Sequence, residues 1–186
     1  MSELAISEHL ATRYDPVSIL LHWLVALLVV VQFALAELWD FPPKPVHHLM
    51  VVTHMSLGVI FAAVLLFRLM WRFLLRHEVE DFTVGLVRVA SRMMHYVLYL
   101  LLVIQVALGF LWRWAENHPV DFFGFSISSP FGAFPKGTND VIGELHDLNA
   151  WVIIILAGGH AAMALVHHFL LRDQILRIML PERQLR

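Results

Sequence analysis

Two histidines in the last apolar segment of the chain are spaced so that they could hold cofactors inside a membrane. His146 and His160 lie fourteen residues apart. In a helix this spacing is about 1400° of rotation and about 21 Å of rise, so both side chains lie on one face. Residues 148–171 include no Asp, Glu, Lys or Arg. Because an ionisable side chain in hydrocarbon is costly without a partner, the spacing predicts two stacked cofactors, with haem iron as the obvious metal.

The composition predicts that this segment belongs to an integral membrane protein. Of the 186 residues, 59% are hydrophobic and 15% are charged, with a mean hydropathy of +0.71. Soluble domains are about 45 to 50% apolar and about 25% charged. Four windows without acidic or basic residues each reach about the twenty residues that a spanning helix needs: residues 17–36, 45–67, 93–112 and 148–171. We therefore predict an all-α, four-helix membrane bundle, a single domain over residues 1–186, with helices near 16–38, 46–74, 92–114 and 143–171.

The absence of cysteine narrows the cofactor chemistry. A chain without cysteine has no disulfides, no covalently attached c-type haem, no cysteine-ligated iron-sulfur cluster and no thiolate zinc site. Histidine becomes the natural metal ligand, and the chain has 12. The segment before the first window carries Glu3 and Glu8 and lacks the basic region of a secretory signal, so we expect the first helix to stay in the mature protein.

The basic residues predict how the helices are oriented. With four spans both termini share one side, which carries ten arginines: Arg13, Arg68, Arg72, Arg76, Arg88, Arg92, Arg172, Arg177, Arg183 and Arg186. The other side carries Lys44, Arg113 and Lys136. The positive-inside rule therefore places both termini in the cytoplasm. The outer loops have a formal balance of −4, because they add seven carboxylates: Glu37, Asp40, Glu116, Asp121, Asp140, Glu144 and Asp147.

Placing the histidines by depth gives two levels. His54 and His146 fall near the outer side of their helices, and His22 and His160 lie deeper, towards the cytoplasm. A b-type haem with two axial histidines needs one imidazole from each of two facing segments. The depths satisfy this requirement twice, so these four histidines are the predicted iron ligands. His95 is level with the inner pair and is the best substitute for His22.

Other interpretations stay open for single residues. A lone histidine in a membrane helix can simply donate a hydrogen bond to a neighbouring carbonyl. The glycines near the histidines can serve close helix packing without any cofactor. His167 and His168 lie near the cytoplasmic headgroups, where a quinone contact is one reading and an ordinary interfacial position is another. The connection over residues 113–143 has three prolines and four glycines, which predicts irregular structure.

Several stretches of the sequence resemble the bacterial cytochrome b561 family, the small di-haem proteins of the inner membrane. The resemblance extends over residues 14–181, and the stretches that carry it are Ile-Leu-Leu-His-Trp at 19–23, Thr-His-Met-Ser-Leu-Gly at 53–58, Phe-Arg-Leu-Met-Trp-Arg at 67–72, the stretch 95–102, His146, the run Gly-His-Ala-Ala-Met-Ala-Leu-Val-His-His at 159–168, and Arg172-Asp173. The resemblance implies axial ligands at His22, His54, His146 and His160, the same four that depth selects.

The resemblance also implies a function. Such proteins carry electrons across the membrane through two b haems and exchange them with ubiquinone, and one type is a superoxide oxidase. Superoxide is an anion and is attracted by positive potential, whereas the outer loops here are acidic. The alternative is a haem anchor subunit that passes electrons between quinol and a periplasmic redox protein. A colourless helical transporter that uses the histidines for protons is a third reading. The expected partners are the lipid bilayer and quinone, with no role for nucleic acid.

Overall fold

The computed structural model of the protein describes residues 14–74, 85–132, 134–173 and 175–180. These residues form four long helices: α1 (Pro16–Leu38), α2 (Lys44–Leu74), α3 (Gly85–Ala115) and α4 (Lys136–Val166). Each is long and apolar enough to cross a membrane, which confirms the predicted four-helix membrane fold. Four of the ten arginines that predicted the orientation lie outside the described residues, namely Arg13, Arg76, Arg183 and Arg186.

Local chemistry sets the start of α1. Asp15 caps the helix, because its Oδ1 accepts a hydrogen bond of 3.0 Å from the backbone N–H of Ser18. Pro16 occupies the first turn, where no N–H is needed. Two later helices begin earlier than the predicted bounds, α3 at Gly85 and α4 at Lys136. The prediction began these two helices at residues 92 and 143, whereas α4 already includes Lys136 and the exposed Asp140 before that point.

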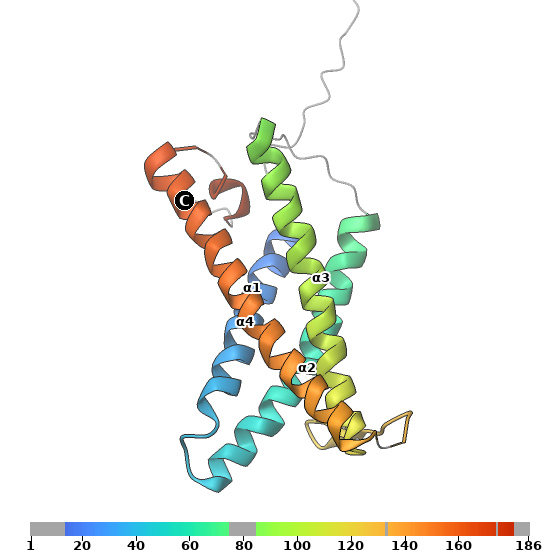
Figure 1. Cartoon of the computed structure of the whole chain (residues 1–186). Coiled ribbons are helices and arrows are strands. Elements are labelled where there is room, and N and C mark those ends of the chain that lie inside the picture. The colour runs from blue at the N-terminus through green and yellow to red at the C-terminus, as the bar shows by residue number, and fades with distance from the viewer. Residues whose placement is uncertain (1–13, 75–84, 133, 174, 181–186) are drawn as a thin grey trace, which may run out of the picture.

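The helices are arranged as two neighbouring pairs. α1 packs along α2 and α3 packs along α4, with fewer contacts between the pairs. Figure 1 shows that the two pairs cross and then diverge towards the end that carries the α1–α2 and α3–α4 connections. We call this end the loop end, and the opposite end, where α1 begins and α4 finishes, the terminal end. The buried core lies where the pairs cross and consists of Val25, Leu28, Phe61, Leu65, Leu102 and Ile153.

A small β-hairpin interrupts the connection between α3 and α4. Its strands are β1 (Val120–Phe122) and β2 (Phe125–Ile127), which pair antiparallel. The two turn residues, Phe123 and Gly124, both have positive φ angles, 42° and 91°, as a tight two-residue hairpin turn requires. β1 lies against α2. The sequence predicted only irregular structure here, because strands of three residues are too short to show an alternating pattern.

The terminal end of α4 departs from regular α-helix. Residues His167–Leu171 form a π-helical turn, and Arg172 follows with a left-handed backbone, φ 54°. Farther on, the short helix Arg177–Met179 lies against α1, since the indole N–H of Trp23 donates a 2.8 Å hydrogen bond to the Met179 carbonyl. The chain after α4 therefore turns back over the terminal end of the bundle.

Candidate functional site

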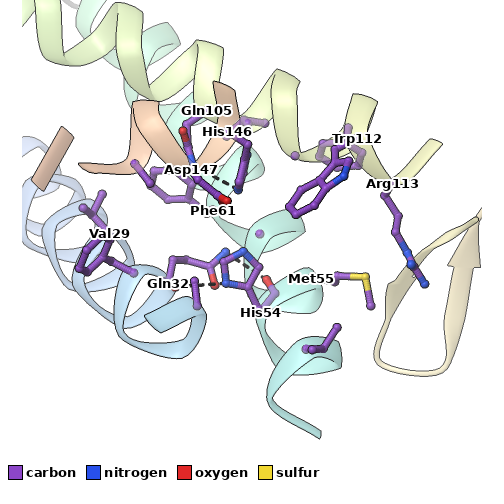
Figure 2. Close-up of a pocket in the computed structure, with 18 of the residues that line it drawn as sticks. Val29, Gln32, His54, Met55, Phe61, Gln105, Trp112, Arg113, His146 and Asp147 are labelled. Carbon is purple, nitrogen blue, oxygen red and sulfur yellow. Dashed lines mark hydrogen bonds between the residues drawn. The ribbon is translucent and has the colours of Figure 1, made fainter. Parts of the chain in front are cut away.

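At the loop end, His54 of α2 and His146 of α4 face one another across a cavity (Figure 2). Their ring centres lie 6.5 Å apart, and the ring planes are inclined by 74°. We call these two residues the loop-end pair. They come from different helix pairs, so the crossing of the two pairs brings together residues that are ninety-two positions apart.

A second pair lies at the terminal end. The ring centres of His22, in α1, and His160, in α4, are 6.3 Å apart with planes inclined by 73°. We call these residues the terminal-end pair. His95 of α3 also lies close to His160, with ring centres 5.2 Å apart. The structure therefore groups the four histidines that depth selected into two pairs and adds His95 to the second.

The ring separations can be tested against the geometry of metal binding. An imidazole nitrogen binds a metal at about 2 Å and lies about 1 Å from its own ring centre. Two imidazoles on opposite sides of one metal atom therefore have ring centres about 6 Å apart. The separations of 6.5 Å and 6.3 Å fit this arrangement, and the 5.2 Å between His95 and His160 is shorter. Both pairs are thus spaced to hold one iron atom each.

Hydrogen bonding prepares His54 to act as a ligand. Its Nδ1 lies 3.1 Å from the backbone carbonyl of Gln32, to which a protonated Nδ1 donates. The side-chain amide of Gln32 returns a 3.0 Å hydrogen bond to the His54 carbonyl. A histidine whose Nδ1–H is held by a carbonyl presents its Nε2 to a metal in a fixed orientation. Gln32 therefore orients this imidazole.

His146 lies in a different polar environment. The amide nitrogen of Gln105 lies 3.2 Å from Nε2 of His146. Asn149 donates to the Gln105 side-chain oxygen at 2.7 Å and to the Leu101 carbonyl at 3.0 Å. Nδ1 of His146 is buried and has no hydrogen-bond partner among the described residues. One ring nitrogen of His146 therefore has no hydrogen bond to a described residue.

The sequence reasoning overlooked these amide side chains, although a signal for them was present. Gln32, Gln105 and Asn149 are the only Asn or Gln residues in the four windows that lack charge. An amide in hydrocarbon is costly unless it is hydrogen-bonded. Their positions could therefore have been predicted to mark polar contacts inside the bundle.

The cavity between the loop-end histidines has a volume of about 360 Å³ and is lined by all four helices and β1. Apolar side chains form most of its wall. Two of its glycines lie close to polar side chains, Gly58 to the Gln32 amide and Gly109 to the His146 ring. A Cβ atom at Gly109 would lie 3.1 Å from Cε1 of His146. The charged lining residues are Glu37, Arg113, Glu116 and Asp147. A flat apolar group would suit the mostly apolar wall of this cavity.

Arginine side chains approach the terminal-end pair. Nη2 of Arg68 lies 3.1 Å from Nδ1 of His22, and Nε of Arg68 donates a 3.0 Å hydrogen bond to the Tyr99 hydroxyl. The guanidinium groups of Arg68 and Arg72 lie 5.5 Å and 5.8 Å from the centre of the Tyr99 ring. These contacts place a positive charge directly beside the terminal-end pair.

An imidazole and a carboxylate meet beyond the terminal-end pair. Nδ1 of His167 lies 2.5 Å from Oδ2 of Asp173, and the backbone N–H of Asp173 donates to the His167 carbonyl at 3.2 Å. The π-helical turn brings these two residues together. Next to them, Nδ1 of His168 is buried without a hydrogen-bond partner among the described residues. This His167–Asp173 pair has the groups needed to hold and pass a proton.

The paired histidines fit a haem. Within the part of the chain that the structure describes, no group of three or more His, Cys, Asp or Glu side chains is placed to hold a metal ion. A haem requires only two axial protein ligands, because the porphyrin supplies the others. Three features suit such a group. They are the spacing of each pair, the ring nitrogen of His146 that has no hydrogen-bond partner among the described residues, and the apolar, glycine-lined cavity.

Comparisons with known proteins agree with this geometry. The sequence profile of prokaryotic cytochrome b561 matches residues 13–182. Cytochrome b561 homolog 2 of Escherichia coli (strain K12) is 32% identical over 173 residues, which cover 90% of this chain and 91% of the relative. Cytochrome b561 homolog 1 of the same organism is 30% identical, with 92% and 99% covered. A probable superoxide oxidase CybB of Yersinia pestis is 27% identical, with 92% and 98% covered. The chain therefore belongs to the prokaryotic cytochrome b561 family.

Proposed function

We propose that the chain carries single electrons across the membrane between two b-type haems, one on each histidine pair, and exchanges them with ubiquinone. Membership of the family and the four spanning helices already indicate a bacterial multi-pass membrane protein that binds b-type haem and transfers electrons across the membrane. The observation that supports two haems is the spacing of the two histidine pairs at two levels of the bundle, 6.5 Å and 6.3 Å between ring centres.

In this proposal each side chain has a defined task. His54 and His146 hold the loop-end haem, and His22 and His160 hold the terminal-end haem. When bound, haem iron supplies reversible one-electron chemistry. Gln32 fixes the orientation of His54 through its backbone carbonyl, and the surrounding apolar wall limits the access of water. His95 lies beside His160 and is the substitute ligand if His22 does not bind.

The exchange with ubiquinone is assigned to the terminal end. Reduction of a quinone to a quinol takes up two electrons and two protons. The His167–Asp173 pair is an imidazole–carboxylate contact beyond the terminal-end pair. Its side chains are 12% and 32% exposed, so water can resupply its proton. His167 lies seven residues after His160, which is about 10 Å along a helix. A quinone ring between them would be close to both the electrons and the proton donor.

We place the protein in the bacterial inner membrane with both termini in the cytoplasm. The described arginines at the terminal end support this orientation, since Arg68, Arg72, Arg88, Arg92, Arg172 and Arg177 all lie there. The loop end has Lys44, Arg113 and Lys136 as its basic residues. Positive charge is retained on the cytoplasmic side of membrane proteins. The loop end then faces the periplasm.

The charges at the loop end bear on the electron donor. Glu37, Glu116 and Asp147 line the cavity. Arg113 also lines it, and its Nη1 lies 3.6 Å from a Glu116 carboxylate oxygen. This ion pair weakens the attraction that the guanidinium would offer to an anion such as superoxide. The observation favours the second candidate function, in which the chain is a haem anchor and exchanges electrons with a periplasmic redox protein.

Haem analysis of histidine variants tests the proposal. We expect His54→Ala and His146→Ala each to lose one haem, and His22→Ala and His160→Ala each to lose the other. Haem content per chain and reduced-minus-oxidised spectra measure this loss. His118→Ala is the control, because His118 is exposed in the α3–α4 connection. A full complement of haem in all four variants would contradict the ligand assignment.

A second experiment distinguishes the donors. The oxidised protein is mixed anaerobically with superoxide and, separately, with ubiquinol, and haem reduction is followed by stopped-flow absorbance. Rapid reduction by superoxide would favour the superoxide oxidase reading and contradict the electrostatic argument. Slow reduction by superoxide, together with co-purification of a stoichiometric periplasmic protein in mild detergent, would support the anchor function.

A further inference from the structure

The two histidine pairs lie in opposite electrostatic surroundings. Near the loop-end pair, three carboxylates line the cavity against one guanidinium: Glu37, Glu116, Asp147 and Arg113. That guanidinium is partly neutralised by Glu116 at 3.6 Å. Negative charge near an iron site opposes the arrival of an electron. The surroundings of the loop-end pair therefore lower its reduction potential.

A hydrogen bond acts in the same direction at the loop end. Nδ1 of His54 faces the Gln32 carbonyl at 3.1 Å. A carbonyl that accepts the Nδ1–H of a metal-bound imidazole makes the ring a more basic ligand. A more basic ligand stabilises the more highly charged, oxidised iron. The hydrogen bond and the carboxylates both make the loop-end site a better electron donor.

The terminal-end pair has a partly buried cation beside it instead. Arg68 reaches His22 at 3.1 Å and is fixed by its hydrogen bond to the Tyr99 hydroxyl. Nη1 of Arg68 is buried without a hydrogen-bond partner among the described residues. A guanidinium stays protonated, and its charge is weakly screened where water is excluded. The charge acts through space, so its effect does not depend on which ring nitrogen of His22 binds iron.

Three other charged side chains at this end, Arg72, Asp15 and Asp173, have contacts of their own. Arg72 lies over the Tyr99 ring and adds to the positive potential. Within the described residues, the carboxylates at the terminal end are Asp15 and Asp173. Asp15 accepts hydrogen bonds from Ser18 and from the Trp71 indole. Asp173 contacts His167.

We propose that Arg68 raises the reduction potential of the terminal-end site and so makes electron transfer from the loop-end site to the terminal-end site favourable. The inference rests on the proposed function. With haem bound at both pairs, one electron would pass from the loop-end site, which would be oxidised, to the terminal-end site, which would be reduced. No atom or proton needs to move in this step. Arg68 touches no reacting atom and acts through its charge, which increases the difference in reduction potential between the two sites.

Redox titration of the purified haem protein tests this role. In Arg68→Gln we expect the higher of the two midpoint potentials to fall, with a change of at least about tenfold in the equilibrium constant for the electron, which is about 59 mV for a one-electron couple. The lower midpoint should move much less. Arg68→Lys keeps the charge and should restore most of the difference. Arg177→Gln removes an exposed cation from the same end and should leave both midpoints unchanged.

The order of the two midpoints gives an independent test that does not require substitution of Arg68. The haem that remains in His54→Ala should titrate at the higher of the two wild-type midpoints. A remaining haem at the lower midpoint would overturn the proposal, as would Arg68→Gln with both haems bound and both midpoints unmoved. If the wild-type protein binds no haem, it is the proposed function that fails, so the two failures are distinguishable.

Discussion

The hydroxyl of Ser56, fully buried in α2, accepts a 3.1 Å hydrogen bond from the backbone N–H of Phe123 at the turn of the β-hairpin. The same hydroxyl lies 3.4 Å from the Asp121 carbonyl. A residue in a membrane helix thus holds a segment of the α3–α4 connection against the bundle. Val120 of the same hairpin is buried and lines the loop-end cavity. The hairpin is therefore part of the wall of this site.

Replacement of Ser56 should loosen the hairpin. We expect Ser56→Ala to cost about 0.5 to 1.5 kcal/mol, because the partly buried hydrogen bond from the Phe123 N–H is lost. Amide hydrogen exchange of residues 120–127 should speed up, and limited proteolysis should cut there first. Ser126→Ala is the matched control, since Ser126 makes an exposed hydrogen bond to Asp121 within the hairpin. Equal protection in both variants would show that Ser56 does not hold the hairpin.

Close packing of α3 on α4 should depend on Gly143. A Cβ atom at this position would lie 2.9 Å from Cε2 of Trp112. We therefore expect Gly143→Ala to destabilise the protein by about 1 to 3 kcal/mol, the usual cost of overpacking. Gly158→Ala is the control, because nothing lies within 4 Å of a Cβ there. Thermal unfolding in detergent measures both, and equal melting temperatures would contradict the prediction.

The hydrogen-bonded amide side chains beside His146 should contribute to the stability of the protein and to the absorbance of the loop-end haem. Asn149→Ala removes two hydrogen bonds, to the Leu101 carbonyl and to the Gln105 side chain. Hydrogen bonds between membrane helices are worth about 0.6 to 2 kcal/mol, so we expect a loss of stability in this range. Because Gln105 also loses an anchor, the absorbance of the loop-end haem should shift. Asn139→Ala, which removes an exposed contact to Glu116, should leave the spectrum unchanged.

The His167–Asp173 contact should matter for quinone chemistry and not for haem binding. Asp173→Asn keeps the shape of the side chain but removes its negative charge. We expect quinone reduction to slow by about 10²-fold or more, in the range that a positioned proton donor contributes, at normal haem content. Steady-state turnover with a soluble quinone measures the change. Unaltered turnover would place the proton donor elsewhere.

The fold was predictable from the sequence because hydrocarbon imposes simple rules on it. Long charge-free windows indicated the four helices, and the depth of each histidine grouped His54 with His146 and His22 with His160. The structure brings those residues together in pairs. Their role as iron ligands stays a prediction. Depth alone also admitted His95, and the structure brings this residue close to His160 as well.

The β-hairpin and the position of Arg68 could not be predicted, because they depend on contacts between segments far apart in the chain. The β-hairpin has strands too short to show a pattern, and it is held by Ser56, sixty-seven residues away from Phe123. The position of Arg68 beside His22 likewise spans forty-six residues. An arginine near a membrane boundary usually just anchors the protein there, so its place beside a histidine could be found only in three dimensions.

The division of the bundle into two helix pairs has a consequence for assembly. Each histidine pair takes one residue from the α1–α2 half and one from the α3–α4 half. Contacts between the halves are fewer than those within them. If iron joins each pair, the two cofactors act as cross-links that fasten one half to the other. We expect each helical hairpin to insert by itself and the arrival of haem to complete the docking, so that haem supply would control how much folded protein accumulates.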